Sequence, residues 1–272
     1  SPGQLLPVKA LLGVMAEADV SDAVIDAFVA GYVVAVDEGD GEEAAEAYQY
    51  AEVDGIRVRY ARKGGDGSAV LLIHGFGGDL DNWLFNIDAL AERNTVLALD
   101  LPGHGQSDRR LPGKTLKDLA RFVAHFLDAV GVERVHLVGH SMGGAIASRL
   151  ALDHPDKVAS VALIGSAGLG NEVNTGYIER FVAAQSRRDL KPVVEQLFAD
   201  ANLVTRQMLE DLLKYKRFDG VTELLTELRG SLFGNGRQSE LPGQQLGETG
   251  KPVLVVWGRE DRVIPAQHAG NA

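Results

Sequence analysis

VHLVGHSMGG, residues 135–144, is the stretch of this sequence that decides the fold. Residues of buried-strand character lead directly into a Gly-x-Ser-x-Gly turn, and a helical pattern follows from Ala145 to about Leu152. A serine at such a turn adopts a strained backbone, and its hydroxyl projects above the sheet edge over a helix N-terminus. Gly139 and Gly143 leave room for the chain to reverse. We therefore expect Ser141 to be a nucleophile.

Strand-like and helical runs alternate on both sides of this stretch. Alternating strands and helices predict an α/β fold with a mostly parallel sheet and right-handed crossovers. An antiparallel hairpin is predicted at residues 53–60, around Asp54-Gly55. The strands expected to be buried on both faces are 69–73, 95–99, 134–138, 158–164 and 252–257, and the helices between them are 80–93, 115–130 and 145–153.

The alternation stops between residues 170 and 250, where only helical patterns occur, at 175–187, 191–199, 205–215 and 220–229. A helical insertion between two sheet strands predicts a lid over the active site.

A glycine-rich loop, His74-Gly75-Phe76-Gly77-Gly78, follows the strand at 69–73. Such a loop can turn a backbone N–H, here that of Phe76, toward a developing oxyanion, and the N–H of Met142 would be the second donor. The alternative is an ordinary glycine turn. We expect His74, Gly75 and His140 to shape the pocket, with the His140 side chain pointing away from the reaction.

The orienting acid is predicted at Asp261, which follows the strand at 252–257, with Glu260 the weaker candidate. This arrangement resembles that of α/β-hydrolases, and the resemblance implies a catalytic histidine some tens of residues after the acid. Eleven residues follow Asp261, and His268 is the sole histidine among them. A helix and a strand do not fit in that interval, so we expect the base to lie beyond residue 272, which would leave the chain as written inactive.

Composition excludes several classes of function. The net charge of −11 argues against a nucleic-acid partner, and the lack of cysteine excludes disulfides and thiolate sites. No apolar run approaches the length of a membrane span, and no signal peptide is evident, so we expect a cytoplasmic protein without a membrane partner. No histidine pair has metal-ligand spacing, and no metal is expected.

Four motifs resemble those of the α/β-hydrolase superfamily: HGFGG at 74–78, DLPGHGQSD at 100–108, GHSMGG at 139–144 and GRED at 258–261. Upstream, LPVKALLGVMA at 6–16 and VSDAVIDAFVAGY at 20–32 resemble the end of a lipoyl domain and the segment after it. We therefore expect a lipoyl-domain remnant at 1–36, an acidic linker at 37–49 and an α/β-hydrolase domain at 50–272. That order resembles the dihydrolipoamide acetyltransferase component of acetoin dehydrogenase complexes.

This resemblance implies an acyltransferase that moves an acetyl group from a dihydrolipoyl thioester to coenzyme A through a serine acyl-enzyme. The partners implied are the other components of the complex and a small-molecule acyl substrate. The lipoyl group would lie on a lysine upstream of Ser1, and Lys9 would not be modified. Two alternatives stay open: a hydrolase acting on esters or carbon–carbon bonds of small carbonyl compounds, and a non-catalytic scaffold.

Overall fold

The structure is a computed structural model that describes residues 48–65 and 67–272. The predicted lipoyl-like segment and most of the predicted linker lie outside these residues. Tyr48 and Gln49 belong to the first strand, so the sheet begins two residues before the predicted start of the hydrolase domain.

A seven-stranded sheet forms the centre of the described part, with the strand order β1-β2-β4-β3-β5-β6-β7. The predicted hairpin is present, because β1 and β2 pair antiparallel, and β2 also pairs antiparallel with β4. The remaining pairs are parallel, as predicted. The strands are β1 (Tyr48–Val53), β2 (Ile56–Lys63), β3 (Ala69–Ile73), β4 (Thr95–Leu99), β5 (Val135–His140), β6 (Val158–Ile164) and β7 (Val253–Val256).

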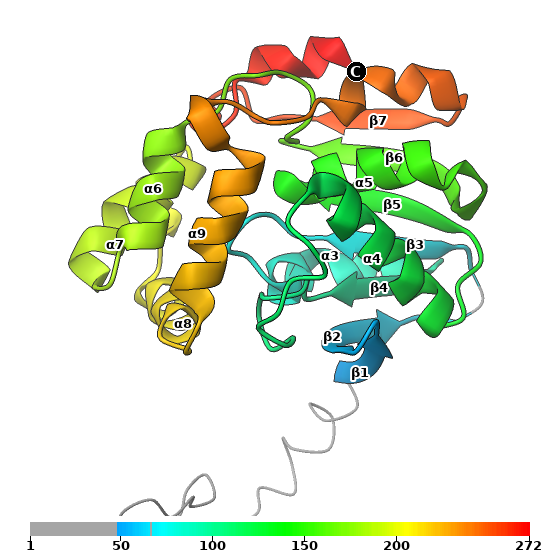
Figure 1. Ribbon diagram of the computed structural model, residues 1–272, viewed down its shortest axis with the longest axis horizontal. Coiled ribbons are helices and arrows are strands. Elements are labelled where there is room, and N and C mark those ends of the chain that lie inside the picture. The colour runs from blue at the N-terminus through cyan, green and yellow to red at the C-terminus, as the bar shows by residue number, and fades with distance from the viewer. Residues whose placement is uncertain (1–47, 66) are drawn as a thin grey trace, which may run out of the picture. The chain divides into compact units, whose positions relative to one another are not determined.

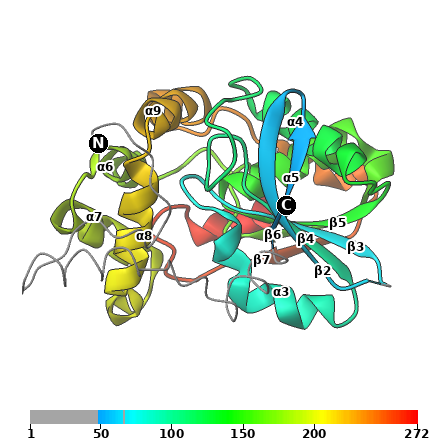
Figure 2. The same cartoon turned by 90° about the horizontal axis from the view of Figure 1, so that it is seen from below.

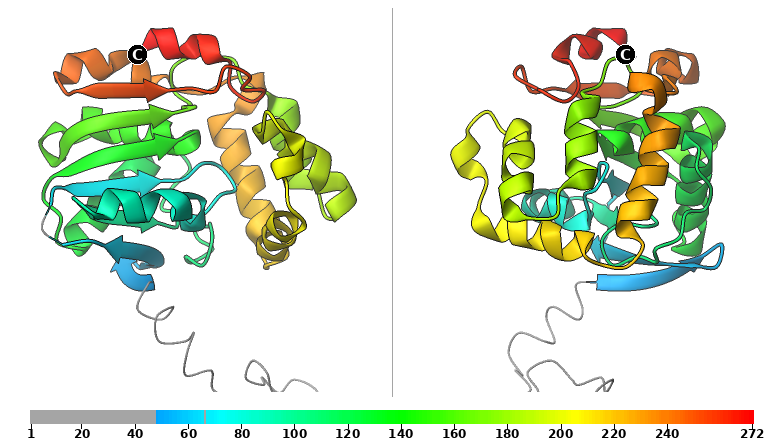
Figure 3. Two further views of the ribbon diagram at one scale, coloured as in Figure 1. Left: turned by 180° about the vertical axis from the view of Figure 1, so that it is seen from behind. Right: turned by 60° about the vertical axis from the view of Figure 1, so that its left-hand side comes forward.

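Helices cover both faces of this sheet, α4 (Leu116–Ala129) and α5 (Met142–Asp153) on one face and α3 (Leu84–Ala91) on the other (Figures 1 and 3). Successive residues of β3 alternate between the two resulting cores: Leu71 and Ile73 belong to the larger one, and Val70 and Leu72 to the smaller. A strand buried on both faces needs such an unbroken apolar run.

The register of the parallel strands brings their carboxyl ends to one edge. Ile73 pairs with both Leu99 and Gly139, and Ile164 pairs with His140 and Val256. The residues that follow these strands therefore meet at this edge, where ligands bind in open α/β sheets.

A helical insertion, residues 165–252, lies between β6 and β7, and its four α-helices gather beyond that end of the sheet (Figure 2). The end of the insertion, residues 242–249, returns to pack against α5. Its helices are α6 (Thr175–Ala183), α7 (Arg187–Val194), α8 (Arg206–Lys216) and α9 (Val221–Leu232). Short 3₁₀ helices complete the described part: η1 (Leu80–Trp83), η2 (Pro155–Lys157), η3 (Glu195–Leu197), η4 (Ala201–Leu203), η5 (Gly234–Gly236), η6 (Pro242–Thr249) and η7 (Ala266–Asn271).

One strand differs from its prediction. The run at 252–257 is typical of a strand buried on both faces, yet Leu254 is 60% exposed and Val256 is 48% exposed. On this edge strand Val255 packs against the larger core, whereas Leu254 and Val256 point to the opposite face and belong to neither core of the described residues.

Candidate active site

Ser141 occupies the sharp turn between β5 and α5. Its φ of 52° and ψ of −120° lie in a region that non-glycine residues rarely adopt, and within residues 48–65 and 67–272 only Asp54 shares a positive φ without being glycine. Backbone hydrogen bonds hold this turn in place. The Ser141 N–H donates to the Ile164 carbonyl at 3.1 Å, and the Ser141 carbonyl accepts from Gly144 and Ala167, both at 3.0 Å. Such strain at a fixed turn is typical of a functional residue.

The glycines of the motif are there because the backbone packs too closely for a side chain. A Cβ on Gly139 would fall 2.4 Å from the Gly143 carbonyl oxygen, and one on Gly143 would fall 2.2 Å from the Ile73 carbonyl oxygen. A Cβ on Gly144 would lie 2.0 Å from Ser166 Oγ. The motif therefore fixes how closely the turn at Ser141, which we call the elbow, approaches β3.

The loop after β3 lies directly against Ser141. An ideal Cβ on Gly75 would fall 3.0 Å from Ser141 Cβ. The Phe76 N–H donates to no acceptor within the described ranges, and the N–H of Met142 opens α5, where no intrahelical acceptor exists. Both predicted donors are thus available to a ligand at the elbow.

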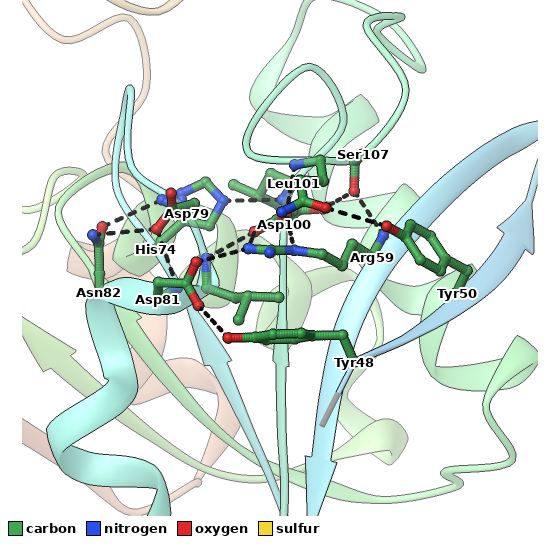
Figure 4. Close-up of polar contacts among 12 residues, drawn as sticks. Tyr48, Tyr50, Arg59, His74, Asp79, Asp81, Asn82, Asp100, Leu101 and Ser107 are labelled. Carbon is green, nitrogen blue, oxygen red and sulfur yellow. Dashed lines mark hydrogen bonds and ion pairs between the residues drawn. The ribbon is translucent and has the colours of Figure 1, made fainter. Parts of the chain in front are cut away.

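His74, the first residue of this loop, links it to Leu101 in the loop after β4 (Figure 4). Its ring is fully buried, with Nδ1 at 2.8 Å from the Gly75 carbonyl and Nε2 accepting from the Leu101 N–H at 3.0 Å. Nδ1 therefore carries the proton and donates it to Gly75. Burial lowers the pKa of His74 to about 4, so the imidazole is neutral near pH 7. These contacts give His74 a supporting position, not that of a base.

A buried ion pair, which the sequence analysis missed, braces the same edge (Figure 4). Arg59 Nε contacts Asp100 Oδ2 at 2.7 Å, and the two side chains are 3% and 0% exposed. Asp100 also accepts from the N–H groups of Leu80 and Gln106, both at 2.8 Å. Burial raises the pKa of the Asp100 carboxyl, and the Arg59 guanidinium opposes that effect. The one sequence signal was an aspartate placed immediately after the strand at 95–99.

Asp261 lies in the turn after β7. Its Oδ1 accepts from the N–H groups of Val263 at 2.8 Å and Ile264 at 2.9 Å, while its Oδ2 lies 3.3 Å from an ideal Cβ on Gly165, the residue after β6. One carboxylate oxygen therefore fixes the turn and the other faces the neighbouring strand end. The adjacent Glu260 is exposed.

Two of the remaining histidines, His140 and His268, are close in sequence to Ser141 and Asp261. His140 Nδ1 is 3.2 Å from an ideal Cβ on Gly75, which places the ring beside the loop after β3. The residue is exposed, yet desolvation by nearby protein atoms lowers the pKa of its imidazole, while the Asp261 charge raises it. His268 is buried elsewhere, with Nε2 at 2.8 Å from Glu172 Oε2 and its ring edge-on to Trp257. Neither imidazole hydrogen-bonds to Ser141.

The helical insertion packs onto the loops around Ser141. The Phe181 ring of α6 lies 2.3 Å from an ideal Cβ on Gly77, and Phe76 meets Phe181 and Phe233 edge-on. At the loop after β4, the Tyr215 hydroxyl donates to the Gly103 carbonyl at 2.9 Å. Both contacts place the insertion over the carboxyl edge of the sheet.

In the part of the chain that the structure describes, no group of three or more histidine, cysteine or acidic side chains could hold a metal ion. The helices of that part are also too short or too polar to cross a membrane.

A family model described as alpha/beta hydrolase fold matches residues 68–272. The chain belongs to the α/β-hydrolase fold family. Among solved structures, a meta-cleavage product hydrolase from Pseudomonas fluorescens superposes with a TM-score of 0.74 at 24% identity, covering 84% of this chain and 85% of that one. At that identity the match shows the fold alone.

Two relatives match almost the whole chain of this α/β-hydrolase family member. The dihydrolipoyllysine-residue acetyltransferase component of the acetoin cleaving system of Cupriavidus necator is 66% identical over 270 residues, covering 99% of this chain and 72% of the relative. The component of the same name from Pseudomonas putida is 48% identical, covering 98% and 73%. A 2-hydroxy-6-oxononadienedioate/2-hydroxy-6-oxononatrienedioate hydrolase from Burkholderia vietnamiensis is more distant, at 32% identity and 82% of each chain.

Proposed function

We propose that the protein is an acyltransferase that moves an acetyl group from a dihydrolipoyl thioester to coenzyme A, as a component of an acetoin dehydrogenase complex. The observation that carries this proposal is the strained Ser141 elbow in a chain 66% identical to a named acetyltransferase component. The relationship supports the donor, the acceptor and the partner components, and the elbow supports a covalent route.

In the first half-reaction, Ser141 Oγ attacks the carbonyl carbon of the acetyl thioester as its proton passes to a base. The oxyanion that forms accepts from the N–H groups of Phe76 and Met142. Collapse breaks the carbon–sulfur bond, and the dihydrolipoyl thiolate leaves with the proton that the base received. The product is an acetyl ester on Ser141.

In the second half-reaction the thiol of coenzyme A loses its proton to the base and attacks that ester. The same two amides hold the second oxyanion, and collapse returns the proton to Ser141 Oγ. Asp261 orients the base histidine in this scheme. No histidine within residues 48–65 and 67–272 hydrogen-bonds to Ser141 Oγ, so we assign the base to none of them.

The chemistry of the donor fits the side chains above the elbow. The acetyl-dihydrolipoyl arm is uncharged, and the roof beside the loop after β3 is built from the rings of Phe76, Phe181 and Phe233. Aromatic rings of this kind bury an apolar arm without leaving an unpaired charge.

A second candidate is a hydrolase in which water resolves the acetyl-enzyme, favoured by the more distant hydrolase relative. The same site serves both reactions, so the acceptor must be tested. Full-length protein is incubated with S-acetyldihydrolipoamide, with and without coenzyme A, and Ser141→Ala is the control. We expect acetyl-coenzyme A only in the complete mixture and an acetyl adduct on Ser141 without acceptor. Equal thioester loss in both tubes, with no acetyl-coenzyme A, would favour the hydrolase.

A further inference from the structure

A groove lies between the loop at residues 109–114 and the first half of α9, with a cavity volume of about 760 Å³. Its floor is apolar, formed by Leu111 and Leu224. Three basic side chains, Arg109, Arg110 and Lys114, line the loop wall. The groove thus pairs an apolar floor with a cationic wall.

Most of the net negative charge of the sequence comes from residues 1–47 and not from the part that contains this cationic wall. Residues 1–47 hold ten of the 38 acidic residues and one of the 27 basic ones, so the rest of the sequence is close to neutral. Three basic side chains within six residues can then set the local potential.

Arg109 and Arg110 are held in place without a carboxylate partner in the described residues. The Arg109 guanidinium lies over the Phe218 ring, 4.3 Å from its centroid. Arg110 Nη2 donates to the Asp54 carbonyl at 3.3 Å. A guanidinium has five N–H donors in a planar fork, so both side chains keep donors for a bidentate anion such as phosphate.

Two carboxylates face the groove from α9. Lys114 Nζ pairs with Glu227, and Ser231 Oγ donates to the Lys114 carbonyl, so this end of the groove is clamped and its charges compensate. Glu223 is exposed and has no cationic partner within the described ranges. The groove therefore offers two arginines against one uncompensated carboxylate.

Helix α9 connects the groove to the candidate active site. Phe218, which holds Arg109, precedes α9, and Phe233, which contacts Phe76, follows its last residue. Twelve helical residues span about 18 Å. Leu224 on the groove floor also lies 2.4 Å from an ideal Cβ on Gly103, in the loop after β4. The groove thus follows the seam between the insertion and the sheet edge.

We propose that Arg109 and Arg110 bind the phosphate groups of the coenzyme A acceptor, while its extended pantetheine arm follows α9 and brings the thiol to Ser141. This assignment rests on the proposed transferase function, which supplies an acceptor with phosphates at one end and a thiol at the other. Arginine is suited to the first task because its fork matches phosphate oxygens.

The test compares the binding of coenzyme A with that of pantetheine, which has the same thiol arm and no phosphate, by calorimetry on the full chain. In Arg109→Gln/Arg110→Gln we expect the Kd for coenzyme A to rise tenfold or more and the Kd for pantetheine to stay unchanged. Arg62→Gln is the matched control, because Arg62 is an exposed arginine that also donates to one backbone carbonyl, that of Val130. Added salt should weaken the binding of coenzyme A alone.

A second variant, Glu223→Gln, should bind coenzyme A more tightly than the wild type. Removing the uncompensated carboxylate should lower the Kd for coenzyme A several-fold, a result that damage to the fold cannot produce. An unchanged Kd for coenzyme A in the double arginine variant, or an equal loss for both ligands, overturns the assignment. If the wild type forms acetyl-coenzyme A while the double variant binds coenzyme A normally, the groove does not bind the phosphates, and the proposed transferase function is retained. Phosphate-dependent binding without acetyl transfer would overturn the transferase alone.

Discussion

Gly75 lies so close to Ser141 that a Cβ on the glycine would fall 3.0 Å from the serine Cβ and 3.2 Å from His140 Nδ1. Contacts shorter than about 3.4 Å force a neighbour to move, and here the neighbours are Ser141, the proposed nucleophile, and the residue before it. The elbow and the loop after β3 can therefore lie this close only because residue 75 is a glycine, which has no Cβ.

Gly75→Ala is expected to keep the fold and lower kcat by about 10²–10³, the effect of displacing one oxyanion donor. The assay is the release of p-nitrophenol from p-nitrophenyl acetate by full-length protein, with circular dichroism as a check on folding. Gly230→Ala is the control, because an added Cβ at Gly230 in α9 meets nothing within 4 Å. Equal activity of the two variants would show that the loop does not position a donor.

Ser141→Gly should be inactive yet more stable than Ser141→Ala. Both variants lose the hydroxyl, but only glycine relieves the strain at φ 52° and ψ −120°. Strain of about 1–3 kcal/mol, less the added entropy of the unfolded chain, leaves a gain of about 1 kcal/mol. Thermal unfolding should show a Tm about 2–4 °C higher for the glycine variant. A lower Tm for glycine than for alanine would mean that the turn is unstrained.

His74 should make the protein less stable as the pH falls below neutrality. Its pKa is lowered from 6.5 to about 4 in the folded state, so between these values the unfolded chain binds more protons than the folded one. The contribution of the neutral His74 to the free energy of unfolding is therefore fully present above pH 6.5. It falls as the pH drops toward 4, by about 3 kcal/mol over the interval.

The measurement is urea denaturation of the wild type and His74→Gln between pH 4 and pH 7. Glutamine can donate to Gly75 and accept from Leu101 but does not titrate, so the stability advantage of the wild type should shrink as the pH falls. A constant difference across that range would show that the folded and unfolded imidazoles titrate alike.

The sequence predicted the elements well wherever local pattern decides them. The strands at 69–73, 95–99 and 158–164 match β3, β4 and β6 to the residue. The predicted start of α5, Ala145, is three residues late, because Gly143 and Gly144 have low helical propensity. In the structure the helix begins immediately after Ser141, where Gly143 packs closely on the Ile73 carbonyl at the end of β3 and Gly144 packs closely on Ser166.

The buried ion pair between Arg59 and Asp100 was harder to predict. Arg59 meets Asp100 because β2 pairs antiparallel with β4, which sets Tyr60 opposite Leu99 and lets the Asp100 N–H donate to the Arg59 carbonyl at 2.9 Å. An alternating strand gives no indication of which neighbour it pairs with or in which register. Partner choice, and with it the buried ion pair, requires the three-dimensional sheet.

Asp261→Asn should lower the rate of Ser141 acylation by about 10⁴ with little loss of stability. The amide oxygen of asparagine can still accept from the Val263 and Ile264 N–H groups, so the turn is kept while the charge that orients a base histidine is lost. Glu260→Gln is the matched control, because it removes a neighbouring charge from an exposed side chain. Single-turnover acetylation of full-length protein, followed by mass spectrometry, separates this step from turnover. If both variants acylate at the wild-type rate, the orienting acid lies elsewhere, and if Glu260→Gln alone is slow, the assignment belongs to Glu260.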